Sequence, residues 1–363
     1  MFDFIPLSSY TTVYYTVMFL LALLILFHAN TFDVRDKTSL RFFNNLGMFF
    51  LIIFTFYIGL RPISGRYFGD MATYAQGYRL LENGAALKIE KDYVFNYFMQ
   101  FCSQIMPVNY FFLLISILYV VPCYLFSRRY FGSYWFFAFF MFLGSFSFWS
   151  YGTNGIRNGL GTSLFILGLY FYPRKWWMYG FFALSYFVHS SLLIPIAAFV
   201  VSGIYKNPKI YLFIWLACIP LSLIGGSFWE GFFSRLGFAE RTSVYLTGGD
   251  EFKDQFSQTG FRWDFLFYSA FGIVAGWYFI FKKNVSDHFY IHLFGIYCIA
   301  NAFWILVIRA NFSNRFAYLS WFLMAPVIAY PMFKYKIWND QYKIFGYIVL
   351  TYYMFTYLMY LKS

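Results

Sequence analysis

Long apolar runs separated by short polar clusters fill the sequence, and they limit its fold more than any other feature. Runs such as Tyr10 to Ala29 and Val108 to Phe126 approach the roughly 20 residues that a helix needs to cross a bilayer. With 61% hydrophobic and 12% charged residues, the composition is that of a multi-span membrane protein and excludes an ordinary soluble domain. We therefore predict an all-α polytopic membrane protein with about 12 (11 to 13) transmembrane helices, forming a single transmembrane domain over residues 1–363.

The region from Trp176 to Tyr205 gives the strongest constraint on topology. Short basic clusters of the kind retained in the cytoplasm flank it on both sides. Two cytoplasmic ends require an even number of crossings, so we expect two short helices with a turn near Val188 to Ser191. This turn places His189 at or just below the outer membrane face. The first apolar segment lacks the features of a cleaved signal peptide, and we expect it to remain as a helix.

This topology puts both termini outside and separates the basic residues by type. Nine of the fourteen inner basic residues are Lys, whereas nine of the thirteen outer ones are Arg, although the bare count does not fix the orientation. The outer side also holds two longer loops, at about 61–107 and about 227–262. Polar residues at helical spacing predict an amphipathic helix over 93–106 in the first loop, which lies in the interface or re-enters it. If this helix spans the membrane instead, the number of crossings and the side of one terminus change. We expect chemistry on an anion at this arginine-rich face.

Arg157 lies at the start of an apolar run, in the stretch TNGIRNGLG. A guanidinium is a planar clamp for phosphate or diphosphate, and burying one in a membrane costs about 2.5 to 3.5 kcal/mol. Such an arginine therefore usually faces a cavity and a partner, although snorkelling to lipid headgroups is an alternative. The flanking glycines permit close approach of a backbone segment or a ligand.

Three further polar residues have both functional and structural interpretations. His189, in VHSS, can act as a base, as a donor or as a buried structural histidine. Asp70 and Asp264 each stand near an arginine, which makes a structural salt bridge the alternative to a functional role.

Several classes of site are disfavoured by the sequence. The four cysteines lie in apolar segments without CxxC spacing, and the four histidines are scattered, so we expect no metal site and no cofactor. The net charge of +12 has no basic soluble domain to carry it, so we expect no nucleic acid partner and instead membrane lipids and anionic lipid-linked ligands. We attribute part of the high Phe and Tyr content to codon bias. Single aromatic residues are therefore expected to say little about structure or function.

A run from an arginine to a histidine resembles the signature of the EpsG-like, Wzy-type polysaccharide polymerases: GIRNGLGTSLFILGLYFYPRKWWMYGFFALSYFVHSSLLIPI. An earlier stretch, GLRPISGRYFGDMATYAQGY, is similar to the family's early arginine followed by Asp and Tyr. The stretches ERTSVYL, GFRWDFLFYS and NRFAYLSWFLMAP resemble later parts of the family in the same order.

The resemblance implies an architecture related to the GT-C-like glycosyltransferases and ligases. It also implies a metal-independent enzyme of the bacterial inner membrane that joins undecaprenyl-diphosphate-linked oligosaccharide units into O-antigen or a related surface polysaccharide at the periplasmic face. A Wzz-type chain-length regulator and a Wzx-type repeat-unit flippase would be its partners. A catalytic role is then expected for Arg157, His189 and Arg315, diphosphate binding for Arg157, Arg241 and Arg315, and substrate binding for Arg61, Asp70, Tyr74, Arg262 and Asp264.

Three other functions fit the same general pattern. A lipid-linked oligosaccharide flippase would also be polytopic and arginine-rich, although it would more plausibly have two related halves. An O-antigen ligase would share the chemistry and differ mainly in its acceptor. A membrane acyltransferase is compatible with an intramembrane histidine, but the sequence offers no partner motif for an acyl donor.

Overall fold

The computed structural model describes residues 2, 4–86, 91–233, 260–310 and 313–362. Within these residues all regular structure is helical, so the predicted all-α class is confirmed. The chain divides into two compact units, which are described separately: residues 1–192 with 332–363, and residues 193–331. The prediction of one membrane domain stays a prediction.

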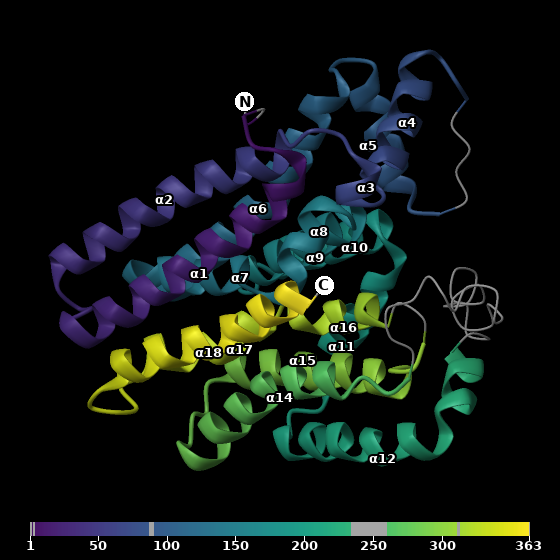
Figure 1. The fold of residues 1–363 in the computed structure, drawn as a ribbon. Helices are drawn as coiled ribbons and strands as arrows, with labels where there is room; N and C mark the ends of the chain where they lie inside the picture. Colours follow the sequence, from purple (N-terminus) through teal and green to yellow (C-terminus); the bar gives the residue numbers. More distant parts are fainter. Residues whose placement is uncertain (1, 3, 87–90, 234–259, 311–312, 363) are drawn as a thin grey trace. The chain divides into compact units, whose positions relative to one another are not determined.

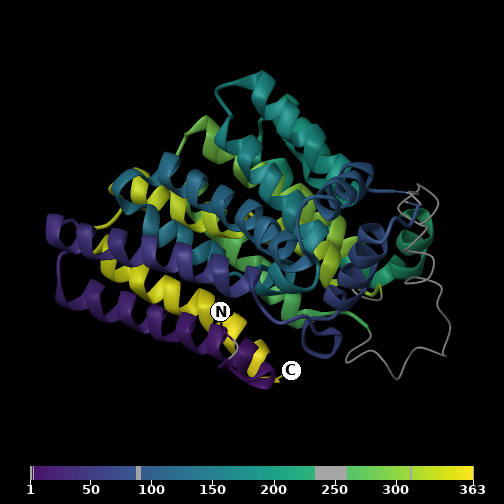
Figure 2. The same ribbon diagram turned by 90° about the horizontal axis from the view of Figure 1, so that it is seen from above.

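The first unit contains most of the helices (Figure 1). They are α1 (Leu7–Thr31), α2 (Lys37–Gly59), α3 (Gly65–Phe68), α4 (Met71–Glu82), α5 (Tyr93–Ser103), α6 (Val108–Phe131), η1 (Gly132–Tyr134), α7 (Trp135–Leu143), α8 (Phe146–Thr153), α9 (Ile156–Tyr170), α10 (Lys175–Val188), η2 (Ser190–Leu192) and α18 (Gln341–Lys362). Helix α1 packs beside α18, as the two views of the fold agree, and α2 packs beside α6 (Figures 1 and 2).

The second unit is built from fewer helices. They are α11 (Leu193–Ile204), α12 (Pro208–Phe233), α14 (Trp263–Trp277), the π-helical turn η5 (Tyr278–Lys282), α15 (His288–Leu306) and α16 (Asn314–Trp321). Helix α17 (Met324–Lys334) begins in the second unit and ends in the first. Helix α15 packs against α11, α12, α14 and α16 and is therefore central to this unit.

Eight helical stretches among the described residues are long and apolar enough to cross a membrane. They are Leu7–Thr31, Lys37–Gly59, Val108–Leu143, Pro208–Gly226, Trp263–Lys282, His288–Leu306, Asn314–Lys334 and Gln341–Lys362. Helices α9 and α10, with 15 and 14 residues, fall below the length of a straight crossing. The protein is thus a polytopic membrane protein, and the number of about 12 spans stays a prediction.

Basic residues gather at one end of the first unit. The end of α6 meets the end of α9 there, because the Arg129 guanidinium lies 4.8 Å from the ring centroid of Tyr170. The start of α18 meets η1 through a 3.1 Å hydrogen bond between the Tyr342 and Tyr134 hydroxyls. The loops between α1 and α2 and between α9 and α10 carry the clusters Arg35 to Lys37 and Arg174 to Lys175.

Tyrosine hydroxyls satisfy backbone carbonyls where helices of the first unit are interrupted. Helix α7 ends at Leu143, and α8 begins only at Phe146. The Leu143 carbonyl accepts a 2.7 Å hydrogen bond from Tyr14, and the Met141 carbonyl accepts one of 3.2 Å from Tyr352. In a bilayer an unsatisfied carbonyl costs several kcal/mol, so these buried tyrosines permit the break within the apolar interior.

The core of the second unit is organised by one buried amide. Asn301, which is 0% exposed, accepts a 2.7 Å hydrogen bond from Trp215 Nε1. Its amide nitrogen donates to the hydroxyls of Ser269 and Ser320 at 3.0 and 2.9 Å. This network joins α12, α14, α15 and α16 in a region that offers no water to polar groups.

Candidate functional site

Asp92 is the centre of a polar cluster in the first unit. Its Oδ2 accepts a 2.8 Å hydrogen bond from Arg157 Nη1 and lies 3.1 Å from His189 Nδ1. Its Oδ1 accepts a 3.2 Å hydrogen bond from the Ser190 backbone amide. One carboxylate therefore joins the start of α5, the start of α9 and the end of α10.

The local backbone explains how Asp92 reaches these partners. Asp92 precedes α5 in the left-handed conformation, with φ 54° and ψ 47°, which Asp and Asn tolerate better than most residues. Helix α10 ends at Val188, so His189 and the Ser190 amide lie at the helix end, where the sequence predicts a turn. Helix α5 packs against both α4 and α10 and holds the aspartate between them.

Arg157 is fixed by two partners in addition to packing. Its Nε donates a 2.9 Å hydrogen bond to the Tyr74 hydroxyl, and its guanidinium lies 5.6 and 6.0 Å from the ring centroids of Tyr74 and Phe95. The arginine side chain is 16% exposed, whereas that of Asp92 is 5% exposed. No described residue accepts a hydrogen bond from Nη2, so one edge of the guanidinium is available to a ligand.

The glycines around Arg157 serve the chain's own packing. A Cβ on Gly159 would lie 2.6 Å from the Tyr151 carbonyl oxygen, so only glycine permits α9 to pass α8 this closely. A Cβ on Gly161 would come within 2.8 Å of Leu192. The sequence suggested that these glycines permit close approach of either a backbone segment or a ligand. At Gly159 and Gly161 it is other segments of the chain that approach.

Asp70 and Asn154 connect the first long loop to the start of α9. The Asp70 backbone amide donates a 2.8 Å hydrogen bond to Asn154 Oδ1. Gly69 has a φ of +54°, and a Cβ there would lie 2.5 Å from the same Asn154 oxygen. The Asp70 side chain also acts electrostatically on Arg157. Asp70 therefore lies near the cluster but does not bind Arg157 directly.

Arg61 is buried at the same end of the unit and is 3% exposed. It donates to the carbonyls of Ile58 and Thr153, the latter at 2.6 Å, at the ends of α2 and α8. Its guanidinium also lies 5.6 and 5.5 Å from the rings of Phe68 and Phe112. In this state Arg61 holds two helix ends together, and its expected contact with substrate stays a prediction.

The other candidates fall in the second unit or outside the described residues. Arg262 binds Asp264 in a bidentate ion pair of 2.9 and 2.7 Å and stacks 3.6 Å from the Phe265 ring centroid. Arg315 lies near the start of α16 and is partly exposed. Arg241 lies outside the described residues. The cluster at Asp92 therefore brings together Arg157, His189 and Tyr74 from the predicted set.

The electrostatics of the cluster favour an ionised Asp92. Burial raises the pKa of this carboxyl, but the hydrogen bond and charge of His189, the charge of Arg157 and the Ser190 amide outweigh it, so the net pKa lies below the ordinary value of 3.8. Within the described residues, no three His, Cys, Asp or Glu side chains lie close enough together to hold a metal ion.

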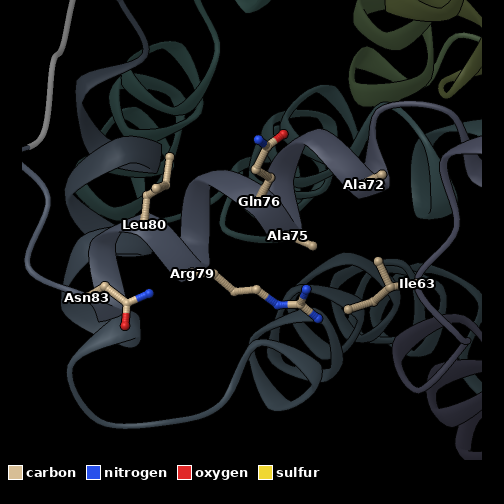
Figure 3. A pocket seen from close by; sticks show the side chains of 7 residues that line it. All are labelled: Ile63, Ala72, Ala75, Gln76, Arg79, Leu80 and Asn83. Atoms are coloured by element: carbon tan, nitrogen blue, oxygen red, sulfur yellow. The ribbon is translucent and has the colours of Figure 1, made fainter.

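A pocket of about 270 Å³ lies on the side of α4 away from Tyr74. Figure 3 shows its lining, with the Arg79 side chain extended toward Ile63. The lining residues are Ile63, Ala72, Ala75, Gln76, Arg79, Leu80 and Asn83. They combine an apolar floor with guanidinium and amide groups that can bind hydroxyl-bearing ligands.

Sequence reasoning missed Asp92, although it expected a catalytic role for both Arg157 and His189. Asp92 stands 65 residues before Arg157 and 97 residues before His189, so no local spacing connects them. The available signal was its position, since it is the acidic residue immediately before the predicted amphipathic helix.

Comparison with known proteins gives one match. The model of the EpsG family matches residues 47–363, which include the whole Asp92 cluster. No curated protein and no solved structure matches the chain. Because the match covers most of the chain, this polysaccharide polymerase-like membrane protein belongs to the EpsG family.

Proposed function

We propose that this protein polymerises undecaprenyl-diphosphate-linked oligosaccharide repeat units into O-antigen or a related surface polysaccharide. The observation that supports this most is the attachment of Arg157 and His189 to one buried carboxylate. Glycosyl transfer from a lipid diphosphate needs a cation for the leaving group and a proton acceptor for the attacking hydroxyl. The cluster holds one residue of each kind in adjacent positions.

In the proposed reaction, a hydroxyl at the non-reducing end of a new unit attacks the anomeric carbon of the growing chain. The new bond joins that oxygen to the anomeric carbon, and the bond from the carbon to the diphosphate oxygen breaks. Its electron pair leaves with the diphosphate, and the hydroxyl proton passes to His189. The outer edge of the Arg157 guanidinium stabilises the charge that develops on the diphosphate.

The proposed location is the bacterial inner membrane with the site toward the periplasm. The basic clusters at the opposite end of the first unit are of the type that stays in the cytoplasm, which supports this orientation. We further propose that Arg241 and Arg315 assist with the diphosphate and that Arg61, Asp70, Tyr74, Arg262 and Asp264 shape the substrate site. A Wzx-type flippase would supply the units, and a Wzz-type regulator would set chain length.

Deletion of the gene followed by gel analysis of the surface glycan tests this function. A polymerase mutant should cap each lipid with one repeat, because units still arrive but are not joined. A complete absence of repeats would instead support a flippase. Polymer of normal length that is not attached to the surface lipid, with no single repeats attached there either, would support a ligase. Complementation with the wild-type chain should restore the ladder.

A further inference from the structure

We infer that Asp92 is a positioning residue that orients His189 as the proton acceptor and aligns Arg157 beside it. This inference rests on the proposed function and adds a residue to its site. It comes from the geometry of the carboxylate, which is almost fully buried: its Oδ2 contacts both Arg157 and His189, and its Oδ1 accepts from the Ser190 amide.

The contact with Asp92 fixes the tautomer of the imidazole. An ionised carboxylate only accepts hydrogen bonds, so at 3.1 Å the Nδ1 of His189 must carry the hydrogen. In the neutral ring Nε2 is then the basic nitrogen, and it is the atom that takes the proton of the acceptor hydroxyl. The Ser190 amide holds the other carboxylate oxygen, which prevents the carboxylate from rotating away from the ring.

The same carboxylate sets the position of the arginine. Because Asp92 binds Nη1 and Tyr74 binds Nε, the guanidinium has one defined orientation with Nη2 left for substrate. Guanidinium and imidazole thus share a single reference point, Oδ2 of Asp92. Small displacements of catalytic groups lower the rate by large factors. A hydrogen-bond partner shared by both groups therefore keeps them in the correct relative position.

The charged and titratable groups around the histidine are few among the described residues. Asp92 contacts its ring, Arg157 from α9 donates to the same carboxylate oxygen, and Tyr74 from α4 accepts a hydrogen bond from Arg157. Asp70 acts on Arg157 from the loop before α4. Removal of the negative charge at Asp92 should therefore stabilise the imidazolium less and leave the arginine charge nearby.

The substitution that isolates this role is Asp92→Asn. Asparagine has the same shape and also tolerates the left-handed backbone of this position, so the change removes charge with little strain. Asp33→Asn is the matched control, because Asp33 forms an exposed aspartate–arginine pair with Arg35 at the basic end of the unit. His189→Gln identifies the signal of the ring among the four histidines.

The first measurement needs no substrate. Nitrogen NMR of histidine-labelled protein in detergent should show His189 with hydrogen on Nδ1 in the wild type and in Asp33→Asn. In Asp92→Asn we expect a mixture of tautomers. An unchanged spectrum in Asp92→Asn, or hydrogen on Nε2 in the wild type, would overturn the positioning role whether or not the protein is a polymerase.

The second measurement uses the single-repeat lipid that accumulates in the deletion strain. In vesicles, Asp92→Asn should lower the single-turnover rate of joining by about 10²- to 10⁴-fold, with a small change in KM and an acid limb displaced to lower pH. If Asp92→Asn lowered the rate equally at every pH and left the pH profile unchanged, Asp92 would have only a structural role. If the wild type joins no units while the NMR result holds, the proposed function fails and the orientation of His189 stands.

Discussion

Arg157 Nη1 donates to Asp92 Oδ2 at 2.8 Å, and the two side chains are only 16% and 5% exposed. The removal of one partner from a buried pair leaves an uncompensated charge and costs about 3 to 5 kcal/mol. Loss of activity alone in a single variant of this pair is therefore mixed with effects on folding, which is why Asp92→Asn is read by the His189 tautomer and the pH profile. The pair must be tested with variants that separate the two.

The first prediction concerns this separation. Arg157→Ala should lower the free energy of unfolding strongly and abolish polymer, whereas Arg157→Ala combined with Asp92→Asn should recover most of the stability without recovering polymer. Thermal unfolding in detergent and a glycan gel of complemented cells measure the two effects. Long ladders from well-expressed Arg157→Ala protein would remove the arginine from the mechanism.

The second prediction concerns the contact between Gly69 and Asn154. Gly69→Ala should destabilise the protein by about 1 to 3 kcal/mol through its backbone conformation alone, and more because its Cβ meets Asn154 Oδ1 at 2.5 Å. Gly132→Ala is a matched control, since Gly132 also has a φ of +54° but nothing lies within 4 Å of its Cβ. The melting temperatures should rank wild type, then Gly132→Ala, then Gly69→Ala. Equal melting temperatures for the two variants would show that the contact with Asn154 does not affect stability.

The third prediction concerns the buried amide of the second unit. Asn301→Leu should cost about 1 to 3 kcal/mol, because it leaves the buried Trp215 indole N–H without its acceptor. The Ser269 and Ser320 hydroxyls each lose one hydrogen bond but keep Trp321 Nε1 and the Ala317 carbonyl as partners. Trp215→Phe in the Asn301→Leu background removes this unsatisfied N–H and should restore part of the loss. Thermal unfolding of the two single variants and the double variant measures this coupling. Strictly additive effects would contradict a shared network.

The fourth prediction concerns acid. The pKa of Asp92 is lowered below 3.8 in the folded state, so its contribution to stability is fully present above that value and is lost as the pH falls through the folded pKa. The difference in unfolding free energy between wild type and Asp92→Asn should therefore persist between pH 7 and pH 5, where protonation of His189 beside the carboxylate can only increase it, and shrink only in strong acid. A difference that already disappears between pH 7 and pH 5 would be inconsistent with the ionised carboxylate.

The sequence was informative where physical patterns are local. Apolar runs predicted the helical membrane class, and the basic flanks of Trp176 to Tyr205 predicted the helix end at His189, which the structure confirms. The glycines beside Arg157 signalled close approach, although the approaching atoms include the Tyr151 backbone. These features depend on neighbours that are near in sequence.

The remainder depends on contacts between distant segments. Asp92 acts through residues 65 and 97 positions away, and no periodicity reports such a distance. Tyrosine content was attributed in part to codon bias, yet Tyr14 donates to the Leu143 carbonyl 129 residues later, where a helix ends inside the unit. Single aromatic residues thus carry structural information that only the fold shows.

The most direct test of the account is joining by the purified protein. Wild-type chain in vesicles, supplied only with the single-repeat lipid from the deletion strain, should convert it into a ladder of longer lipid-linked chains and release undecaprenyl diphosphate. The His189→Gln and Arg157→Lys variants, inserted at equal amounts, should leave the single repeat unchanged. Ladders of wild-type length from both variants, or no ladder from the wild-type protein with this lipid, would contradict a polymerase site at Asp92, Arg157 and His189.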